Sequence, residues 1–239
     1  MSGNLKQVLV FDEDQSSILP AEGESVAVEV SSVRTPSHFY VTLPWGSLTI
    51  PQVTSMSSGP ANIEFYKGKR LDTDYSVYAM GEAVAAYCKR SKAWLRAKVV
   101  DTDPDEEEVL VMYVDFGDKE WVSERDIRQL DKCFIHLPPQ AVECSLVKVI
   151  PPRPRVAWPA ESRREFWSLV NKKTLVARVV KRMWSGRLMV ELFDTSSGED
   201  VDIGATLIRR NLASLDTSSP ISQLMSPGDG GDQVHYIPG

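Results

Sequence analysis

The feature that most limits the fold is a series of short strand-like segments between residues 77 and 130. Each is rich in β-branched, aromatic or small apolar residues, and the segments are Glu82–Tyr87, Trp94–Val100, Val109–Val114 and Lys119–Val122. An acidic turn over 101–108 and a second turn over 115–118 separate the last three of them. Four or five short strands within about fifty residues are typical of a small, strongly bent β-barrel.

Further strands are predicted on both sides of this block. Val26, Val28 and Val30 alternate with small or polar residues, which is the period of a half-buried strand. Other strand-like runs cover 39–43, 141–150, 175–180, 188–193 and 201–203. Two or three strands are marginally stable alone. We therefore expect the flanks to pair with each other, which makes the chain a mainly β protein with the barrel inserted into a split domain.

A few helices complete this prediction. Pro159 suits the first turn of a helix that runs to about Lys173, with Phe166, Leu169 and Val170 as its apolar stripe. Short helices are also expected within 47–75 and over 205–213. The resulting divisions are a partly ordered arm over 1–24, the first part of the split domain over 25–76, the barrel over 77–130, a linker helix with the second part over 131–215, and a disordered tail over 216–239.

Charge and motif content restrict the function. The chain has 27 Lys and Arg against 33 Asp and Glu, a formal net charge of −6, which suits a cationic partner better than a phosphate backbone. No apolar run approaches the roughly 20 residues of a membrane span, and no signal peptide is expected. The three cysteines and three histidines do not cluster, so we expect free thiols, no metal and no cofactor. No kinase or hydrolase motif set is complete, and we expect no enzymatic activity.

Several motifs resemble one family. The sequences VAAY (84–87), WLRA (94–97) and MYVDFGD (112–118) are similar to the strands and turn of a Tudor domain. The flanking segments 137–146 and 192–198 resemble those that complete an extended Tudor domain, in which a Tudor barrel is inserted into a staphylococcal-nuclease-like OB fold. The resemblance covers roughly residues 25 to 215. Within the family, the pattern is most similar to the Tudor and KH domain proteins of the germline small-RNA pathway, although no KH domain lies in this chain.

This resemblance implies a cage of aromatic rings that binds arginine, often dimethylated. Carried over by position, the cage consists of Tyr87, Leu95, Tyr113 and Phe116, with Asp118 as its polar member. A cation over a well-placed ring contributes about 0.5 to 2 kcal/mol. Leu95 stands where the family usually has tyrosine, and Asp118 where it usually has asparagine. Since a carboxylate accepts charge-assisted hydrogen bonds from a guanidinium, we expect unmodified arginine to bind at least as well as symmetric dimethylarginine.

Plainer roles remain open for the same residues. Tyr87, Tyr113 and Phe116 could be ordinary barrel core, and a shared cage needs a sharp bend at 115–117, because residues three apart on a regular strand face opposite sides. Trp94 and Trp121 are expected in the core rather than in the cage. We expect Asp115 to cap the turn, and the acidic run 101–108 to be a solvated hairpin tip.

The resemblance thus predicts a non-catalytic reader of Arg-Gly or Arg-Ala peptide tails of Piwi-type proteins, acting in the germline piRNA pathway. It also implies a cytoplasmic place, in germ granules or at the mitochondrial surface. RNA binding by the OB-like half is the alternative, because residues 150–187 are locally basic and include Trp158, Trp167 and Trp184. The plainer reading of that region is a solvated basic face with core tryptophans. A methyl-lysine reader is a third, weaker option.

Overall fold

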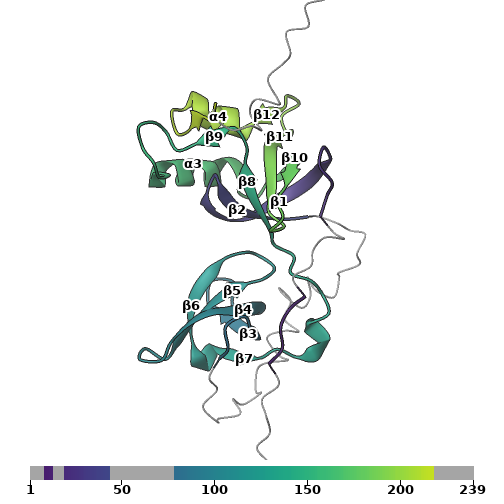
Figure 1. Ribbon diagram of the computed structural model, residues 1–239, viewed down its shortest axis with the longest axis vertical. Coiled ribbons are helices and arrows are strands. Elements are labelled where there is room, and N and C mark those ends of the chain that lie inside the picture. Colours follow the sequence, from purple (N-terminus) through teal and green to yellow (C-terminus); the bar gives the residue numbers. More distant parts are fainter. Residues whose placement is uncertain (1–7, 13–18, 44–77, 218–239) are drawn as a thin grey trace, which may run out of the picture.

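The computed structural model describes residues 8–12, 19–43 and 78–217. These residues form two β-rich parts that lie one above the other (Figure 1). The short helix predicted within 47–75 lies outside the described residues, as does the tail beyond residue 217. None of the helices in the described part of the chain has the length and apolarity that crossing a membrane requires.

The first part is a sheet made from both ends of the described chain. Its strands are β1 (Ser25–Thr35), β2 (His38–Thr42), β8 (Val142–Leu146), β10 (Thr174–Arg182), β11 (Leu188–Asp194) and β12 (Val201–Asp202), in the order β10-β1-β2-β8-β11-β12. Strand β10 also pairs with β11, which closes β1, β2, β8, β11 and β10 into a ring. The alternating valines Val26, Val28 and Val30 are buried inside it, as their period predicts. We call this ring with its helices the split domain.

Two helices cover the split domain. They are α3 (Ala160–Val170) and α4 (Ile203–Arg209), both shorter than predicted. The predicted apolar stripe of α3 is confirmed, since Phe166 and Val170 are buried, and Phe166 packs edge-on against Phe39 with 5.1 Å between ring centroids. On the other side of α3, Arg163, Arg164 and Trp167 are exposed and share a cavity with residues of the second part of the molecule.

The prediction of one strand over 141–150 is wrong. The segment breaks after β8, and the next strand, β9 (Val149–Ile150), pairs with β13 (Ser214–Leu215) instead of continuing in the ring. The break lies at Lys148, whose φ is 63°. A left-handed residue turns the chain out of its strand direction, and the Lys148 ammonium then reaches Glu191 at 2.8 Å.

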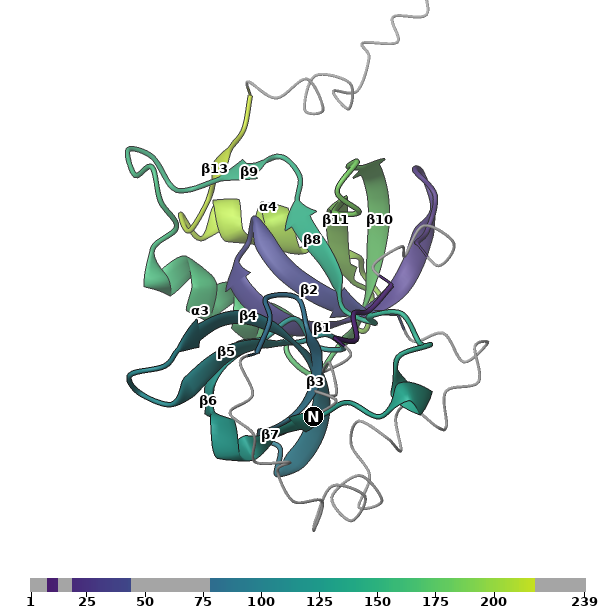
Figure 2. The same cartoon turned by 60° about the horizontal axis from the view of Figure 1, so that its bottom comes forward.

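The second part is a bent, five-stranded barrel inserted between β2 and β8. Its strands are β3 (Ala83–Cys88), β4 (Ala93–Asp103), β5 (Glu108–Tyr113), β6 (Lys119–Ser123) and β7 (Ile127–Gln129), in the antiparallel order β6-β5-β4-β3-β7. A 3-10 turn, η1 (Glu124–Asp126), links the last two strands, and a second, η2 (Lys132–Phe134), follows them. Figure 2 shows the strongly curved strands of this central barrel beneath the split domain.

A buried ion pair ties the central barrel to the segment that leads back to the split domain. Arg96 on β4 donates to both carboxylate oxygens of Asp115, at 3.0 and 2.5 Å. Its guanidinium also donates to the carbonyls of Phe134, Leu137 and Pro138, at 2.6 to 3.1 Å. The guanidinium thus joins the turn after β5 to the chain that leaves the barrel.

Candidate functional site

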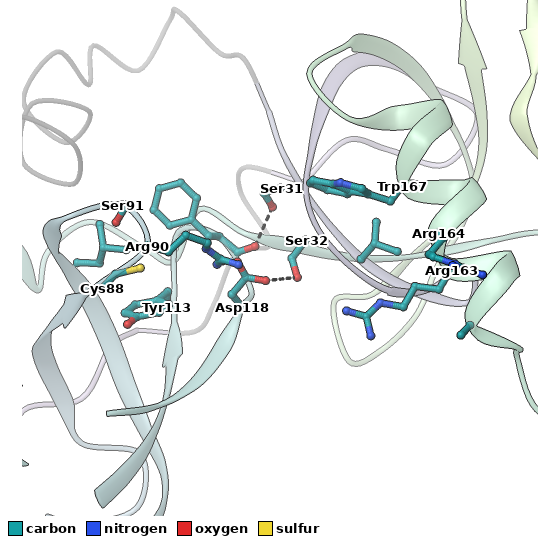
Figure 3. A pocket seen from close by; sticks show the side chains of 14 residues that line it. Ser31, Ser32, Cys88, Arg90, Ser91, Tyr113, Asp118, Arg163, Arg164 and Trp167 are labelled. Atoms are coloured by element: carbon teal, nitrogen blue, oxygen red, sulfur yellow. Dashed lines mark hydrogen bonds and ion pairs between the residues drawn. The ribbon is translucent and has the colours of Figure 1, made fainter. Parts of the chain in front are cut away.

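A cavity of about 680 Å³ lies between the mouth of the central barrel and helix α3. Three walls surround it. The barrel wall consists of Cys88, Arg90, Ser91, Leu95, Tyr113, Phe116 and Asp118; the strand wall of Ser31, Ser32 and Val33 from β1; and the helix wall of Ala160, Arg163, Arg164 and Trp167. Figure 3 shows the barrel residues on one side, Trp167 and the two arginines on the other, and the two serines between them.

Four of the five predicted site residues line this cavity: Leu95, Tyr113, Phe116 and Asp118. Leu95 and Tyr113 are buried and belong to the barrel core as well, so these core side chains also line the cavity. Phe116 is partly buried and packs against the same core. The cavity therefore has an apolar floor and a more exposed rim.

The turn after β5 brings three of these residues together. Phe116 N–H and Gly117 N–H both donate to the Tyr113 carbonyl, at 3.1 and 2.8 Å, and Gly117 has a φ of 85°. A glycine adopts this left-handed conformation without steric cost. The chain therefore bends where a shared cage requires it, and Tyr113, Phe116 and Asp118 face one space.

Both oxygens of Asp118 are already engaged. Ser32 Oγ donates to Oδ1 at 2.6 Å, and Arg90 Nη2 lies 2.5 Å from Oδ2. The charge of Asp118 raises the pKa of Arg90, which stays protonated. The Arg90 side chain is nonetheless 73% exposed, and it comes from the loop between β3 and β4. The chain thus presents one of its own guanidinium groups to the carboxylate at the rim.

Tyr113 contributes a neutral ring to the floor. Its hydroxyl donates to Glu120 Oε2 at 2.8 Å. Burial raises the pKa of Tyr113, and the hydrogen bond to Glu120 raises it further. A phenol that keeps its proton keeps the negative ring face that attracts a cation.

The structure places Tyr87 away from the cavity. Its ring packs on Trp94, with 5.6 Å between centroids, in a separate cluster outside the barrel interior. Successive side chains of a strand point to opposite faces. Ala86 and Cys88 therefore point into the barrel while Tyr87 points out, and the buried thiol of Cys88 lines the cavity in its place.

Trp94, Trp121 and Asp115 all lie outside the cavity. Trp94 is buried outside the cavity, as expected, whereas Trp121 is 45% exposed and is not a core residue. Asp115 does not line the cavity, and its carboxylate accepts from Arg96 and from Gln140 N–H at 3.3 Å rather than from the backbone of its own turn, as the capping expectation required. Trp121 is exposed because side chains alternate along β6 and its neighbour Val122 is the one in the barrel core.

The other cavity-lining residues come from segments outside the Tudor-like sequence motifs. Ser31 and Ser32 lie more than eighty positions before Phe116 and Asp118 in the sequence. Ser31 Oγ donates to the Phe116 carbonyl at 2.8 Å, and Ser32 Oγ donates to Asp118 Oδ1 at 2.6 Å. Ala160, Arg163, Arg164 and Trp167 recur at the spacing of one helical face. The sequence shows this spacing, but it does not show that this face of the helix lies across from the barrel.

No group of three or more His, Cys, Asp or Glu side chains suited to hold a metal occurs among the described residues. Cys88, Cys133 and Cys144 are free thiols, and burial raises the pKa of Cys144 beyond the physiological range. What the cavity offers is an apolar floor, ring faces and one carboxylate. Such an arrangement is chemically suited to holding a cation.

Comparison with known proteins identifies the family. The sequence profile of the Tudor domain matches residues 20–148, more than half of the 239-residue chain, so the chain belongs to the Tudor domain family. The Tudor and KH domain-containing protein homolog of Drosophila melanogaster is 32% identical over 243 aligned positions, which cover 89% of this chain and 41% of that protein. Human RING finger protein 17 is 27% identical over 202 residues, covering 83% and 12%. The chain spans less than half the length of these relatives.

Solved structures place the fold within the extended Tudor class. The extended Tudor domain of Drosophila melanogaster Papi matches with a TM-score of 0.71 and 29% identity, covering 81% of this chain and 100% of that one. The extended Tudor domain TD3 of mouse TDRD1, in complex with a MILI peptide containing dimethylarginine, matches with a TM-score of 0.73 at 24% identity, covering 87% and 98%. A variant of the Papi domain has been solved with Piwi N-terminal peptides whose arginine is unmethylated or dimethylated. The predicted fold class is confirmed, and Tudor domains are binding modules.

Proposed function

We propose that this chain is a non-catalytic reader of arginine-containing peptide tails of Piwi-type proteins and acts in the germline piRNA pathway. The arginine enters the cavity at the barrel mouth, where its guanidinium lies against Tyr113 and Phe116 and hydrogen-bonds to Asp118. The observation that carries this proposal is that these three side chains line one cavity and that the carboxylate already holds a guanidinium. The peptide complexes of the Papi domain support the choice of partner.

Methylation preference follows from how the walls are built. With Tyr87 outside the cavity and Leu95 and Cys88 on the floor, the ring faces at the barrel end are those of Tyr113 and Phe116. The carboxylate of Asp118 then supplies a larger share of the attraction, and it acts on N–H donors that methylation removes. We therefore expect unmodified arginine to bind at least as tightly as symmetric dimethylarginine.

Calorimetric titration with matched peptides tests the proposal. Peptides that differ only in one arginine, its symmetric dimethyl form or a lysine are titrated into the wild type, Phe116→Ala and Trp121→Ala. The arginine peptide should bind about as well as the dimethylated one or better. Phe116→Ala should weaken binding by about tenfold, the loss of one ring face and its apolar contact. The exposed Trp121 is the control, because it lies on the barrel but outside the cavity.

A tenfold preference for the dimethylated peptide would contradict the expected methylation preference. Equal binding by wild type and Phe116→Ala would contradict the cage itself. Binding of the lysine peptide in place of the arginine peptide would assign the site to a different reader class.

Removing Arg90 should raise the affinity for an arginine peptide by about threefold to fivefold. The incoming guanidinium has to replace Arg90 on Asp118, and an exposed ion pair of this kind contributes up to about 1 kcal/mol. Arg90→Ala frees the carboxylate before the ligand arrives. Lys89→Ala is the matched control, since Lys89 lies in the same loop, pairs with Asp126 at 3.6 Å and is not part of the cavity. Weaker binding by Arg90→Ala would mean that this arginine supports the ligand rather than competes with it.

We also propose, from the family resemblance alone, that the protein acts in the cytoplasm, in germ granules or at the mitochondrial surface. Microscopy of the tagged full-length protein in germ cells tests this placement. A purely nuclear distribution would contradict it.

A further inference from the structure

Helix α3 turns a stripe of four residues toward the cavity, two of them arginines. Ala160, Arg163, Arg164 and Trp167 follow the i, i+3, i+4, i+7 spacing that gathers side chains on one helical face. The opposite face holds Phe166 and Val170 in the core of the split domain. Trp167 remains 39% exposed although it is a large apolar side chain. We call these four residues the α3 stripe; Figure 3 shows its tryptophan and arginines across from Asp118.

The two arginines of the α3 stripe carry positive charge that no carboxylate of the described residues neutralises within 4 Å. Two other arginines of the split domain differ, since Arg178 pairs with Glu191 and Arg187 with Glu143. The nearby acid Glu165 on α3 is itself paired with Arg210. Both stripe arginines are solvent-exposed and line the same space as the proposed arginine site.

The cavity is therefore polarised. Its helix end carries two guanidinium groups and an indole. Its barrel end carries ring faces and the Asp118 carboxylate, whose charge Arg90 offsets until an incoming cation replaces it. A peptide with positive side chains throughout would meet like charge at the helix end, which opposes binding. A peptide with a cation at one end and an anion at the other matches both walls.

We propose that the α3 stripe is a second subsite, which binds an acidic side chain, aspartate or glutamate, of the same peptide whose arginine enters the barrel mouth. This inference rests on the proposed function of that mouth. Arg163 and Arg164 donate charge-assisted hydrogen bonds to the carboxylate, and Trp167 covers the apolar part of the peptide between the two charges. The stripe thus selects among arginine-containing sequences by what flanks the arginine.

The experiment compares peptides in which one residue near the arginine is aspartate or asparagine, moved to successive positions on either side. Each pair is titrated into the wild type and into the double variant Arg163→Gln/Arg164→Gln. At the best position the aspartate peptide should bind wild type about fivefold tighter than its asparagine partner, as expected for a partly exposed charge contact. In the double variant the two peptides should bind equally.

Two controls keep the outcomes distinct. Arg153→Gln/Arg155→Gln removes the same charge from exposed positions outside the cavity, and it should leave the aspartate preference intact. Phe116→Ala should weaken both peptides of a pair by the same factor, because it removes the arginine site and not the stripe. Circular dichroism confirms that each variant is folded, which we expect because the stripe arginines are exposed.

The absence of any aspartate preference, or a preference that survives in the α3 variant, overturns the second subsite while leaving the arginine site in place. If neither peptide binds the wild type, the proposed function fails and the subsite fails with it. A short single-stranded RNA that binds wild type but not the α3 variant, with no aspartate preference, overturns the proposal in favour of a nucleic-acid contact.

Discussion

Replacing Arg96 with methionine is expected to lower the free energy of unfolding by about 3 to 5 kcal/mol, which is the cost of breaking a buried ion pair from one side. The Arg96 side chain is 6% exposed, as is its partner Asp115. The substitution leaves the carboxylate and three carbonyl oxygens without their shared donor. Because these acceptors belong to the turn after β5 and to the segment leaving the barrel, the junction of the two parts should loosen.

Urea denaturation followed by circular dichroism measures this loss, with Arg125→Met as the matched control. Arg125 is 81% exposed and its contact with Glu107 is 3.6 Å long, so removing it should cost less than about 1 kcal/mol. An Arg96→Met protein that cannot be obtained in folded form agrees with the large expected loss. A loss as small as that of the control would show that the buried pair does not hold the junction.

Gly117→Ala is expected to cost about 2 to 5 kcal/mol and to weaken arginine-peptide binding at the same time. The φ of 85° is strained for any residue with a Cβ, at about 1 to 2 kcal/mol. A Cβ at this position would also overlap the Tyr40 ring of β2, coming within 2.7 Å of the Tyr40 Cβ and closer to two ring atoms. Overpacking of this kind adds about 1 to 3 kcal/mol. The turn that aims Phe116 and Asp118 would have to move.

Gly198→Ala separates the cost of backbone strain from the cost of overlap with Tyr40. Gly198 has a nearly identical φ of 83°, and nothing lies within 4 Å of a Cβ built there. Its substitution should show only the backbone strain, about 1 to 2 kcal/mol, with unchanged peptide affinity. If both alanine variants lose equal stability in thermal unfolding, the close approach of Tyr40 to the turn contributes nothing.

Much of the fold was predictable because its signals are local. The alternation of Val26, Val28 and Val30 predicts a strand, and the helical spacing of Phe166, Leu169 and Val170 predicts a helix. The motif around Tyr113 and Phe116 also predicted the bend at Gly117. The break at Lys148 was not predictable, because apolar residues continue on both sides of it and the partner of β9 lies more than sixty residues further along the chain.

The candidate site was predictable in part. Alternation along β3 requires Tyr87 and Cys88 to face opposite sides, but it does not say which of the two faces the interior. That choice depends on the pairing of β3 with β4 and β7, which is not local. The α3 stripe and the serines of β1 reach the cavity only through the packing of the split domain against the barrel. No motif in their own segments indicates that position.

Backbone amide NMR during titration with an unmethylated arginine peptide shows whether an arginine side chain occupies the cavity at the barrel mouth. The largest shifts should fall on residues 113–118, on Ser31 and Ser32, and on the cavity face of α3, and a matched lysine peptide should produce far smaller ones. Shifts centred on the hairpin around Trp184, which is 97% exposed and lies outside the cavity, would contradict arginine binding at the barrel mouth.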